Sequence, residues 1–246
     1  MNRVFFENCG IDDEELATII QACHHLNDFK SSVYKQNAFG EKSLAQLPPL
    51  MHKKQIPHHL EEFRLIDCKI TQSTSCQLVN TICSGSMLFK LALVNANLSE
   101  TSIKQLAEFS NTSAYLRELD LSWCKTPRTT WTSFWEEVKS NRQLRELALV
   151  GNLLLEQNEE ASTQTLAHIV HFIKKNHRVQ HINFTSCGLH SLALKEIGAS
   201  LRRTGSLLAI HLCSNPGVEE PGLIDWIRER VGCAPEEKQN RIPNLQ

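Results

Sequence analysis

The chain repeats a pattern about every 28 residues, and this period constrains its fold more than any other feature. Each repeat joins a short segment of alternating apolar residues, typical of a strand, to a second half with helical spacing. The two clearest copies read Leu144-x-x-Leu147-x-Leu149-x-x-Asn152-x-Leu154 and Val179-x-x-Ile182-x-Phe184-x-x-Cys187-x-Leu189. Further copies begin at Met1, Phe29, Leu60, Leu88, Leu116 and Leu207, which gives eight repeats.

The ninth position of each repeat is a cysteine or an asparagine, with one exception. The eight repeats place there Cys9, Asn37, Cys68, Ala96, Cys124, Asn152, Cys187 and Asn215. Because four of the nine cysteines fall in this slot at repeat spacing, we interpret them as part of the architecture. Disulfides are not expected, and cysteine serves here as a small apolar residue in a reducing compartment.

With this period and this slot, the chain resembles a ribonuclease-inhibitor-type leucine-rich repeat domain. It is similar to the repeat regions of NOD-like receptors and of Ran GTPase-activating proteins. The resemblance covers residues 1–231 and implies an α/β solenoid, or horseshoe, of about eight strand-turn-helix repeats. It places a parallel sheet on the concave face and helices on the convex face. Residues 232–246, which are mostly polar, are expected to be a C-terminal tail or linker.

Alternation within each strand predicts which side chains form the core. The fourth and sixth residues of a repeat should point inward together, as in Val4/Phe6, Phe63/Leu65, Leu91/Leu93, Leu119/Leu121, Leu147/Leu149, Ile182/Phe184 and Ile210/Leu212. In one helical segment the inward positions are aromatic or apolar, namely Trp131, Phe134, Trp135 and Val138. We predict that this cluster fills volume between neighbouring repeats.

Two repeats are longer than the 28-residue period: the Phe29 repeat has 31 residues and contains Pro48 and Pro49, and the Leu144 repeat has 35. The polar run at 156–160 lengthens the Leu144 repeat, and we expect it to form a loop. At the N-terminal end, Met1 already occupies the first position of a repeat, so no cap precedes the first strand. We therefore expect missing domains of the same protein or neighbouring subunits to cover this end.

Composition narrows the classes of partner. The formal net charge is −1, which predicts no nucleic-acid surface. No run of about 18 apolar residues is present, and the acidic stretch 12–15 is incompatible with a signal peptide, so we expect a cytoplasmic protein without membrane contact.

No catalytic or cofactor-binding motif is found. The chain has no Cys-x-x-Cys pair, His-Glu-x-x-His motif, glycine-rich phosphate loop or Gly-x-Ser-x-Gly elbow. His168 and His171 have helical spacing, but histidines at such positions are more often solvated than metal ligands. Cys233, in the tail, lacks a positioned basic partner. We predict no enzyme activity, no metal and no cofactor.

The third, fifth and seventh residues of each repeat should line the concave face, with the eighth at its edge. We predict that a protein partner binds there. On this face Val33, Ile66, Val94 and Val150 form an apolar set, and Ala92 and Ala148 would leave space for an inserted side chain. Trp123 is either an aromatic anchor for the partner or a residue packed near Pro127. The candidate binding residues are Arg64, Ile66, Val94, Glu118, Asp120, Trp123, Glu146, Val150, His181 and His211.

These observations predict a non-enzymatic protein-interaction module, part of a larger intracellular regulator or sensor. One alternative is a GTPase-activating or other enzyme-regulating protein, which similarity to the Ran GTPase-activating family suggests. That family has a strongly acidic C-terminal extension, whereas the tail here mixes Glu236 and Glu237 with Lys238 and Arg241. A second alternative is a structural subunit of a large assembly.

Overall fold

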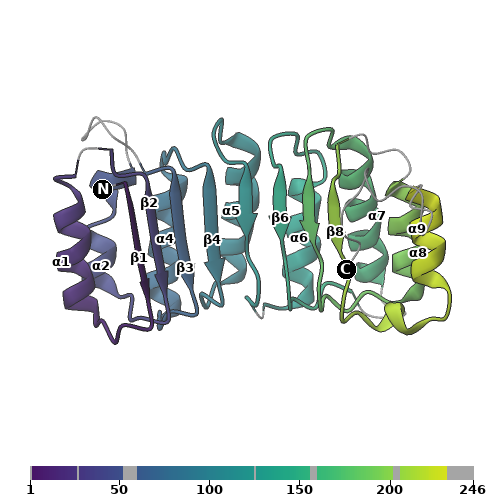
Figure 1. Ribbon diagram of the computed structural model, residues 1–246, viewed down its shortest axis with the longest axis horizontal. Helices are drawn as coiled ribbons and strands as arrows, with labels where there is room; N and C mark the ends of the chain where they lie inside the picture. The colour runs from purple at the N-terminus through teal and green to yellow at the C-terminus, as the bar shows by residue number, and fades with distance from the viewer. Residues whose placement is uncertain are drawn as a thin grey trace. The chain divides into compact units, whose positions relative to one another are not determined.

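A computed structural model describes residues 2–26, 28–51, 60–124, 126–155, 160–201 and 206–231. The chain divides into two compact halves, an N-terminal half at Met1–Cys124 and a C-terminal half at Lys125–Gln246. Figure 1 shows that strands and helices alternate in both halves, with the helices of each half on one face of its strands. The predicted 156–160 loop (apart from Glu160) and the predicted 232–246 tail lie outside the described residues.

In the N-terminal half the elements are β1 (Arg3–Glu7), α1 (Asp13–Cys23), β2 (Ser31–Lys35), α2 (Glu41–Ala45), α3 (Pro48–Met51), β3 (Glu62–Ile66), α4 (Gln72–Cys83), β4 (Lys90–Val94), α5 (Glu100–Thr112) and β5 (Glu118–Asp120). The C-terminal half consists of α6 (Arg128–Val138), β6 (Glu146–Ala148), α7 (Glu160–Lys175), β7 (His181–Asn183), α8 (Ser191–Leu201), β8 (Ala209–His211), the 3₁₀ helix η1 (Pro216–Glu219) and α9 (Leu223–Val231). Each strand pairs in parallel with the next one along the chain within its half. This arrangement confirms the predicted leucine-rich-repeat fold class.

Strand register follows the repeat alignment residue by residue. Arg64 on β3 lies opposite Ala92 on β4, at the same position of successive repeats. The two longer repeats keep this register as well, since Ser31 lies opposite Glu62 and Glu146 lies opposite His181. The repeat position therefore states which side chains are lateral neighbours on the sheet.

The predicted core pairs are buried, with one exception. Phe6 is only half-buried, although its ring stacks on that of Tyr34 at 6.5 Å between centroids. It belongs to β1, which pairs with β2 and has no second neighbour among the described strands. A side chain on an edge strand is covered from one side only, which explains the residual exposure.

Side chains in the Cys/Asn slot hold successive turns together. Asn215 accepts hydrogen bonds from the backbone N–H of Cys187 and Leu189, and donates to the carbonyl oxygens of Phe184, Leu212 and Cys213. The thiols of Cys68, Cys124 and Cys187 donate to carbonyl oxygens of the preceding repeat. The architectural interpretation of this slot is therefore confirmed for these residues, whereas Cys9, in the first repeat, is exposed and its thiol donates to the carbonyl oxygen of Glu7 in the same repeat.

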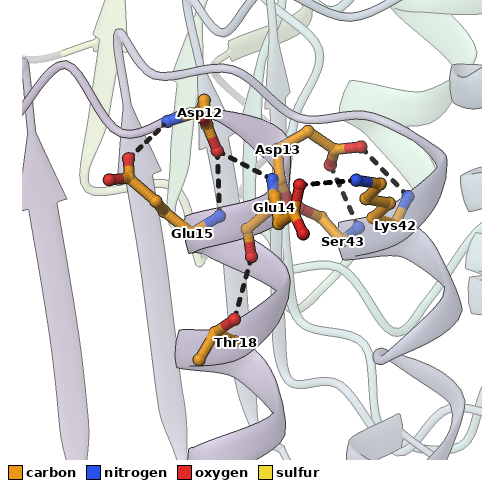
Figure 2. A network of polar contacts seen from close by, with 7 residues as sticks. All are labelled: Asp12, Asp13, Glu14, Glu15, Thr18, Lys42 and Ser43. Carbon is orange, nitrogen blue, oxygen red and sulfur yellow. Dashed lines mark hydrogen bonds and ion pairs between the residues drawn. The ribbon is translucent and has the colours of Figure 1, made fainter.

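Helix α1 starts with a capping box and also caps its neighbour (Figure 2). The Asp12 carboxylate accepts from the N–H groups of Glu14 and Glu15, and the Glu15 side chain accepts from the N–H of Asp12. The Asp13 carboxylate accepts from the N–H groups of Gly40, Lys42 and Ser43, at the start of α2. The N-cap of α2 is a glycine without a side chain, so Asp13 supplies the missing acceptor from the neighbouring repeat.

Aromatic rings on α6 fill the interior of the C-terminal half, as predicted. Trp131, Phe134 and Trp135 are fully buried, and Trp135 contacts Phe172 and Phe184 with ring centroids 5.6 and 5.9 Å apart. Helix α8 packs closely through a small residue instead of a large one. A Cβ on Gly198 would lie 2.9 Å from Ile227 on α9, so the glycine allows α9 to pack closely.

No helix within the described ranges has the length and apolar character needed to cross a bilayer.

Candidate protein-binding face

In the N-terminal half, five predicted binding residues lie on the sheet face that points away from the helices, which we call the open face. Arg64 and Ile66 lie on β3, Val94 on β4, and Glu118 and Asp120 on β5. Each is half-buried, and the residues between them on the same strands are fully buried on the helix side. Alternation along the strand therefore places these five side chains as predicted.

Ion pairs connect side chains on the open face of this half, both within β3 and from strand to strand. Arg64 lies 2.6 Å from Glu62 (Nε to Oε1) and 3.9 Å from Glu118 (Nη2 to Oε2), while the Lys90 Nζ lies 2.6 Å from Glu118 Oε1. Ser31 on β2 donates to Glu62 at 2.5 Å. Partial burial raises the pKa of Glu62, but the hydrogen bond from Ser31 and the charge of Arg64 outweigh it, and the pKa is lowered. These side chains are held in place before any partner arrives.

The expected space beside Ala92 is not present. Ala92 keeps 2% of its surface exposed. It lies between Arg64 on β3 and Asp120 on β5. The ion pair of Arg64 with Glu118 spans β4, and the small side chain of Ala92 lets the guanidinium pass above that strand. The prediction of an open site at Ala92 is wrong because a neighbour's long side chain occupies the volume.

The predicted apolar set is also not one continuous row. Ile66 and Val94 are lateral neighbours, but Val33 lies opposite Arg64, in a different row, and is 2% exposed. Val150 belongs to the C-terminal half. What remains in the N-terminal half is a two-residue apolar strip at the ends of β3 and β4.

One residue of each repeat, directly after the open-face positions, has a left-handed backbone. The residues are Asn8, Gln36, Asp67, Asn95, Trp123, Gly151, Ser186 and Ser214, with φ between 49° and 70°. Glycine, asparagine and aspartate tolerate this conformation best, whereas a bulky residue there is an outlier that costs about 1–2 kcal/mol. Trp123, at φ 61°, is the one aromatic residue of the series and is 45% exposed.

Two carboxylates at the open face and its edge, Asp120 on β5 and Asp67 directly after β3, have no ion-pair partner among the described residues. Asp120 accepts hydrogen bonds from the Ser122 N–H and hydroxyl at 3.0 and 2.5 Å, both at Oδ1. Asp67 accepts from the side-chain amide of Asn95 at 3.2 Å. The other described acids on these strands, Glu7, Glu62 and Glu118, each have a lysine or arginine within 4 Å.

In the C-terminal half the four remaining predicted residues lie on or directly after β6, β7 and β8. Glu146 is exposed, and Val150 follows the end of β6. His181 and His211 lie side by side, with ring centroids 4.8 Å apart, and His181 Nε2 is buried without a hydrogen-bond partner in the described part of the chain. Burial and the neighbouring His181 lower the pKa of His211. These four residues and the six of the N-terminal half thus belong to two separate sets.

Sequence reasoning missed an exposed aromatic pair at the opposite end of the strands. Phe89 and Tyr115 lie next to each other, with ring centroids 6.1 Å apart, and both are more than one-third exposed. It also missed the left-handed slot, although the recurrence of Asn, Asp, Gly and Ser at the eighth position would have indicated it.

The described residues contain no group of three or more His, Cys, Asp or Glu side chains that could hold a metal ion. Burial raises the pKa of Cys124 and of Cys187 to about 12, and that of Cys83 to about 11. A thiol with such a pKa is a poor nucleophile at neutral pH.

No protein-family model matches the chain. Among solved structures, the chain is similar to the actin-binding site 2 domain of leiomodin-1, at 13% identity and a TM-score of 0.47 over 59% of this chain and 79% of that one. It is also similar to the tropomodulin C-terminal domain of Caenorhabditis elegans, at 15% identity and a TM-score of 0.50 over 66% of this chain and 91% of that one. At this identity the second likeness shows the fold alone.

Proposed function

We propose that the chain is a non-enzymatic protein-interaction module, and that the open face of the N-terminal half is its main binding surface. The module would be part of a larger intracellular regulator or sensor, as the resemblance to NOD-like receptors suggests. Other domains of the same protein or a neighbouring subunit are further candidates for the partner.

The observation that carries this proposal is Trp123. Its backbone holds a left-handed conformation that disfavours a bulky side chain, and nearly half of the residue is exposed. A strained, exposed aromatic residue lowers stability without filling the core, which indicates a role outside folding. Tryptophan is also among the residues that contribute most to binding at protein interfaces.

Preorganisation adds a second argument. The ion pairs that fix Arg64, Glu118 and Lys90 across three strands have already ordered side chains that a partner would otherwise have to immobilise. Each side chain ordered in advance removes about 0.5–1.5 kcal/mol from the free-energy cost of association.

Site-specific photo-crosslinking tests the location of the surface. A photoreactive phenylalanine analogue replaces Trp123 in one variant and exposed Thr18, on α1, in a control variant. We expect a discrete crosslinked partner from position 123 and none from position 18. Equal capture at both positions would refute the open face as the main surface.

A triple variant tests the energetics with the purified partner. Val94→Ala, Asp120→Ala and Trp123→Ala together remove the proposed contacts while leaving the buried core pairs intact. We expect binding to weaken by about 2 kcal/mol or more in isothermal titration calorimetry, with an unchanged circular dichroism spectrum. Unchanged affinity would contradict the proposal.

A further inference from the structure

At the end of β5, the N-terminal half combines an exposed aromatic ring with a carboxylate that is in no ion pair with the described residues. Asp120 lies three residues before Trp123, and its carboxylate forms no ion pair with any described residue. The Oδ1 atom is fixed by two hydrogen bonds from Ser122, whereas Oδ2 accepts none from the described part of the chain. One carboxylate oxygen is thus oriented by the protein and the other is free to accept.

The same edge of the open face has an apolar strip and a second acid. Ile66 and Val94 lie opposite each other at the ends of β3 and β4, and both are partly exposed. Asp67, directly after Ile66, is held by the amide of Asn95. Positions 67, 95 and 123 occupy the left-handed slot of successive repeats, so they follow one another at the strand spacing of about 4.8 Å.

We propose that this edge binds an arginine side chain presented by a protein partner. This inference rests on the proposed function and specifies the chemistry of the partner at its anchoring point. The aliphatic part of the arginine lies over Ile66 and Val94, its guanidinium donates to Asp120 Oδ2, and its planar group stacks on the indole of Trp123. Asp67 adds a second negative charge to the same edge.

Charge and shape exclude the other simple occupants. A purely apolar side chain would remove water from the Asp120 carboxylate without replacing its hydrogen bonds, which is costly. An anionic group would be repelled by Asp67 and Asp120. A lysine satisfies the charge, but its compact ammonium does not stack on an aromatic face as a guanidinium does. The surface is therefore complementary to arginine.

Solution NMR on the full chain provides a direct test. The side-chain indole N–H signal of Trp123, assigned by its loss in Trp123→Gly, is followed during titration with N-acetyl-arginine methylamide. The matched probe is N-acetyl-citrulline methylamide, which has the same shape without the charge. We expect a saturable shift of the Trp123 signal with the arginine probe and a response at least about tenfold weaker with the citrulline probe.

Two variants show whether the carboxylate is responsible. Asp120→Asn keeps the size of the side chain and an acceptor for Ser122, and it should weaken the arginine response about tenfold. Glu108→Gln removes an exposed carboxylate from α5, on the helix side of the same half, and should leave the response unchanged. Saturable binding that is equal for both probes, or that survives in Asp120→Asn, would overturn the inference, as would no shift at all.

The outcome separates this inference from the proposed function. If position 123 crosslinks to a partner but the arginine probe gives no shift, the protein-interaction role stands and the arginine site is refuted. If the arginine probe binds while position 123 captures no more than position 18, the arginine site stands and the interaction role of this face is refuted.

Discussion

The two halves of the chain follow the same repeat but place their aromatic residues and charges differently. In the N-terminal half the aromatic contacts run along strands and turns, through Phe6, Tyr34, Phe63 and Phe39. Its helices α4 and α5 bury mainly aliphatic and small residues, and Phe109 is the one aromatic residue among them. In the C-terminal half the rings lie mainly on helices, around Trp135.

The open faces differ in the same way. Strands β3 to β5 carry a continuous set of ion pairs, whereas β7 and β8 carry the histidine pair His181 and His211. The repeat thus determines which positions point inward and where the turns lie. The elements that supply the large core side chains, and the chemistry of the open face, vary independently of it. This independence is why the fold class alone does not name a partner.

The largest expected effect on stability comes from removing Trp135, the central aromatic residue in the core of the C-terminal half. Trp135→Ala deletes a fully buried ring that contacts Phe134, Phe172 and Phe184, and should lower the free energy of unfolding by about 3–5 kcal/mol. Chemical denaturation measures the loss, and amide hydrogen exchange should rise in β6–β8 more than in β1–β4. Phe5→Ala, which removes a ring that is 53% exposed, is the control and should change stability little. An equal rise of exchange in both halves would show that the aromatic core of the C-terminal half does not act locally.

A second test compares the asparagine slots of the two halves. Asn215 makes five hydrogen bonds and Asn37 makes three, all to backbone groups. Replacement by alanine leaves several of these groups unsatisfied, so we expect losses of about 2–4 kcal/mol for Asn215→Ala and about 1–2 kcal/mol for Asn37→Ala. Urea denaturation gives both values. A larger loss at Asn37 would contradict the hydrogen-bond explanation.

A third test concerns the cap that Asp13 supplies to α2. Burial raises the pKa of Asp13, but hydrogen bonds from Ser43, Gly40 and Lys42 outweigh it and the pKa is lowered. A lowered folded-state pKa stabilises the protein above the unfolded value of about 3.9, and this contribution disappears as the pH falls through the folded value. Asp13→Asn should therefore cost about 1 kcal/mol at pH 7, and the difference should shrink below about pH 4. A pH-independent difference in urea denaturation would argue against the carboxylate.

The smallest effect is a difference in reactivity without a change in stability. Cys9 in the N-terminal half is exposed, whereas Cys187, in the same slot of the C-terminal half, is fully buried with a pKa raised to about 12. Limited labelling with N-ethylmaleimide at pH 7.5, read by mass spectrometry, should modify Cys9 well before Cys187. Comparable rates at the two positions would show that the slot opens in solution.

Much of the fold could be predicted because the repeat spacing determines which residues lie side by side on the sheet. Equal repeat positions became lateral neighbours, so the inward pairs and the aromatic positions of α6 followed from counting. The left-handed slot was equally accessible but was overlooked. The domain boundary at 231 and the concave binding site stay predictions.

The open face was predicted less well for a physical reason. The alternation of side chains along a strand predicts on which face of the sheet a residue lies. It does not predict how far a long side chain on a neighbouring strand extends over that face. Ala92 was expected to be open and is covered, because Arg64 reaches across β4 toward Glu118. Likewise, the contact between His181 and His211 depends on how two rings tilt across neighbouring strands, which spacing alone does not determine.

The left-handed residue recurs once in each repeat, so along the edge of each half these positions are separated by the distance between neighbouring strands. Because this position carries a side chain that the core does not use, the tryptophan could be moved from position 123 to position 95 with little change to the interior. Such a move would displace the aromatic ring sideways by one strand spacing, about 4.8 Å. Pairs of exchanged residues could then measure, in discrete steps, where along the sheet a bound protein makes its contact.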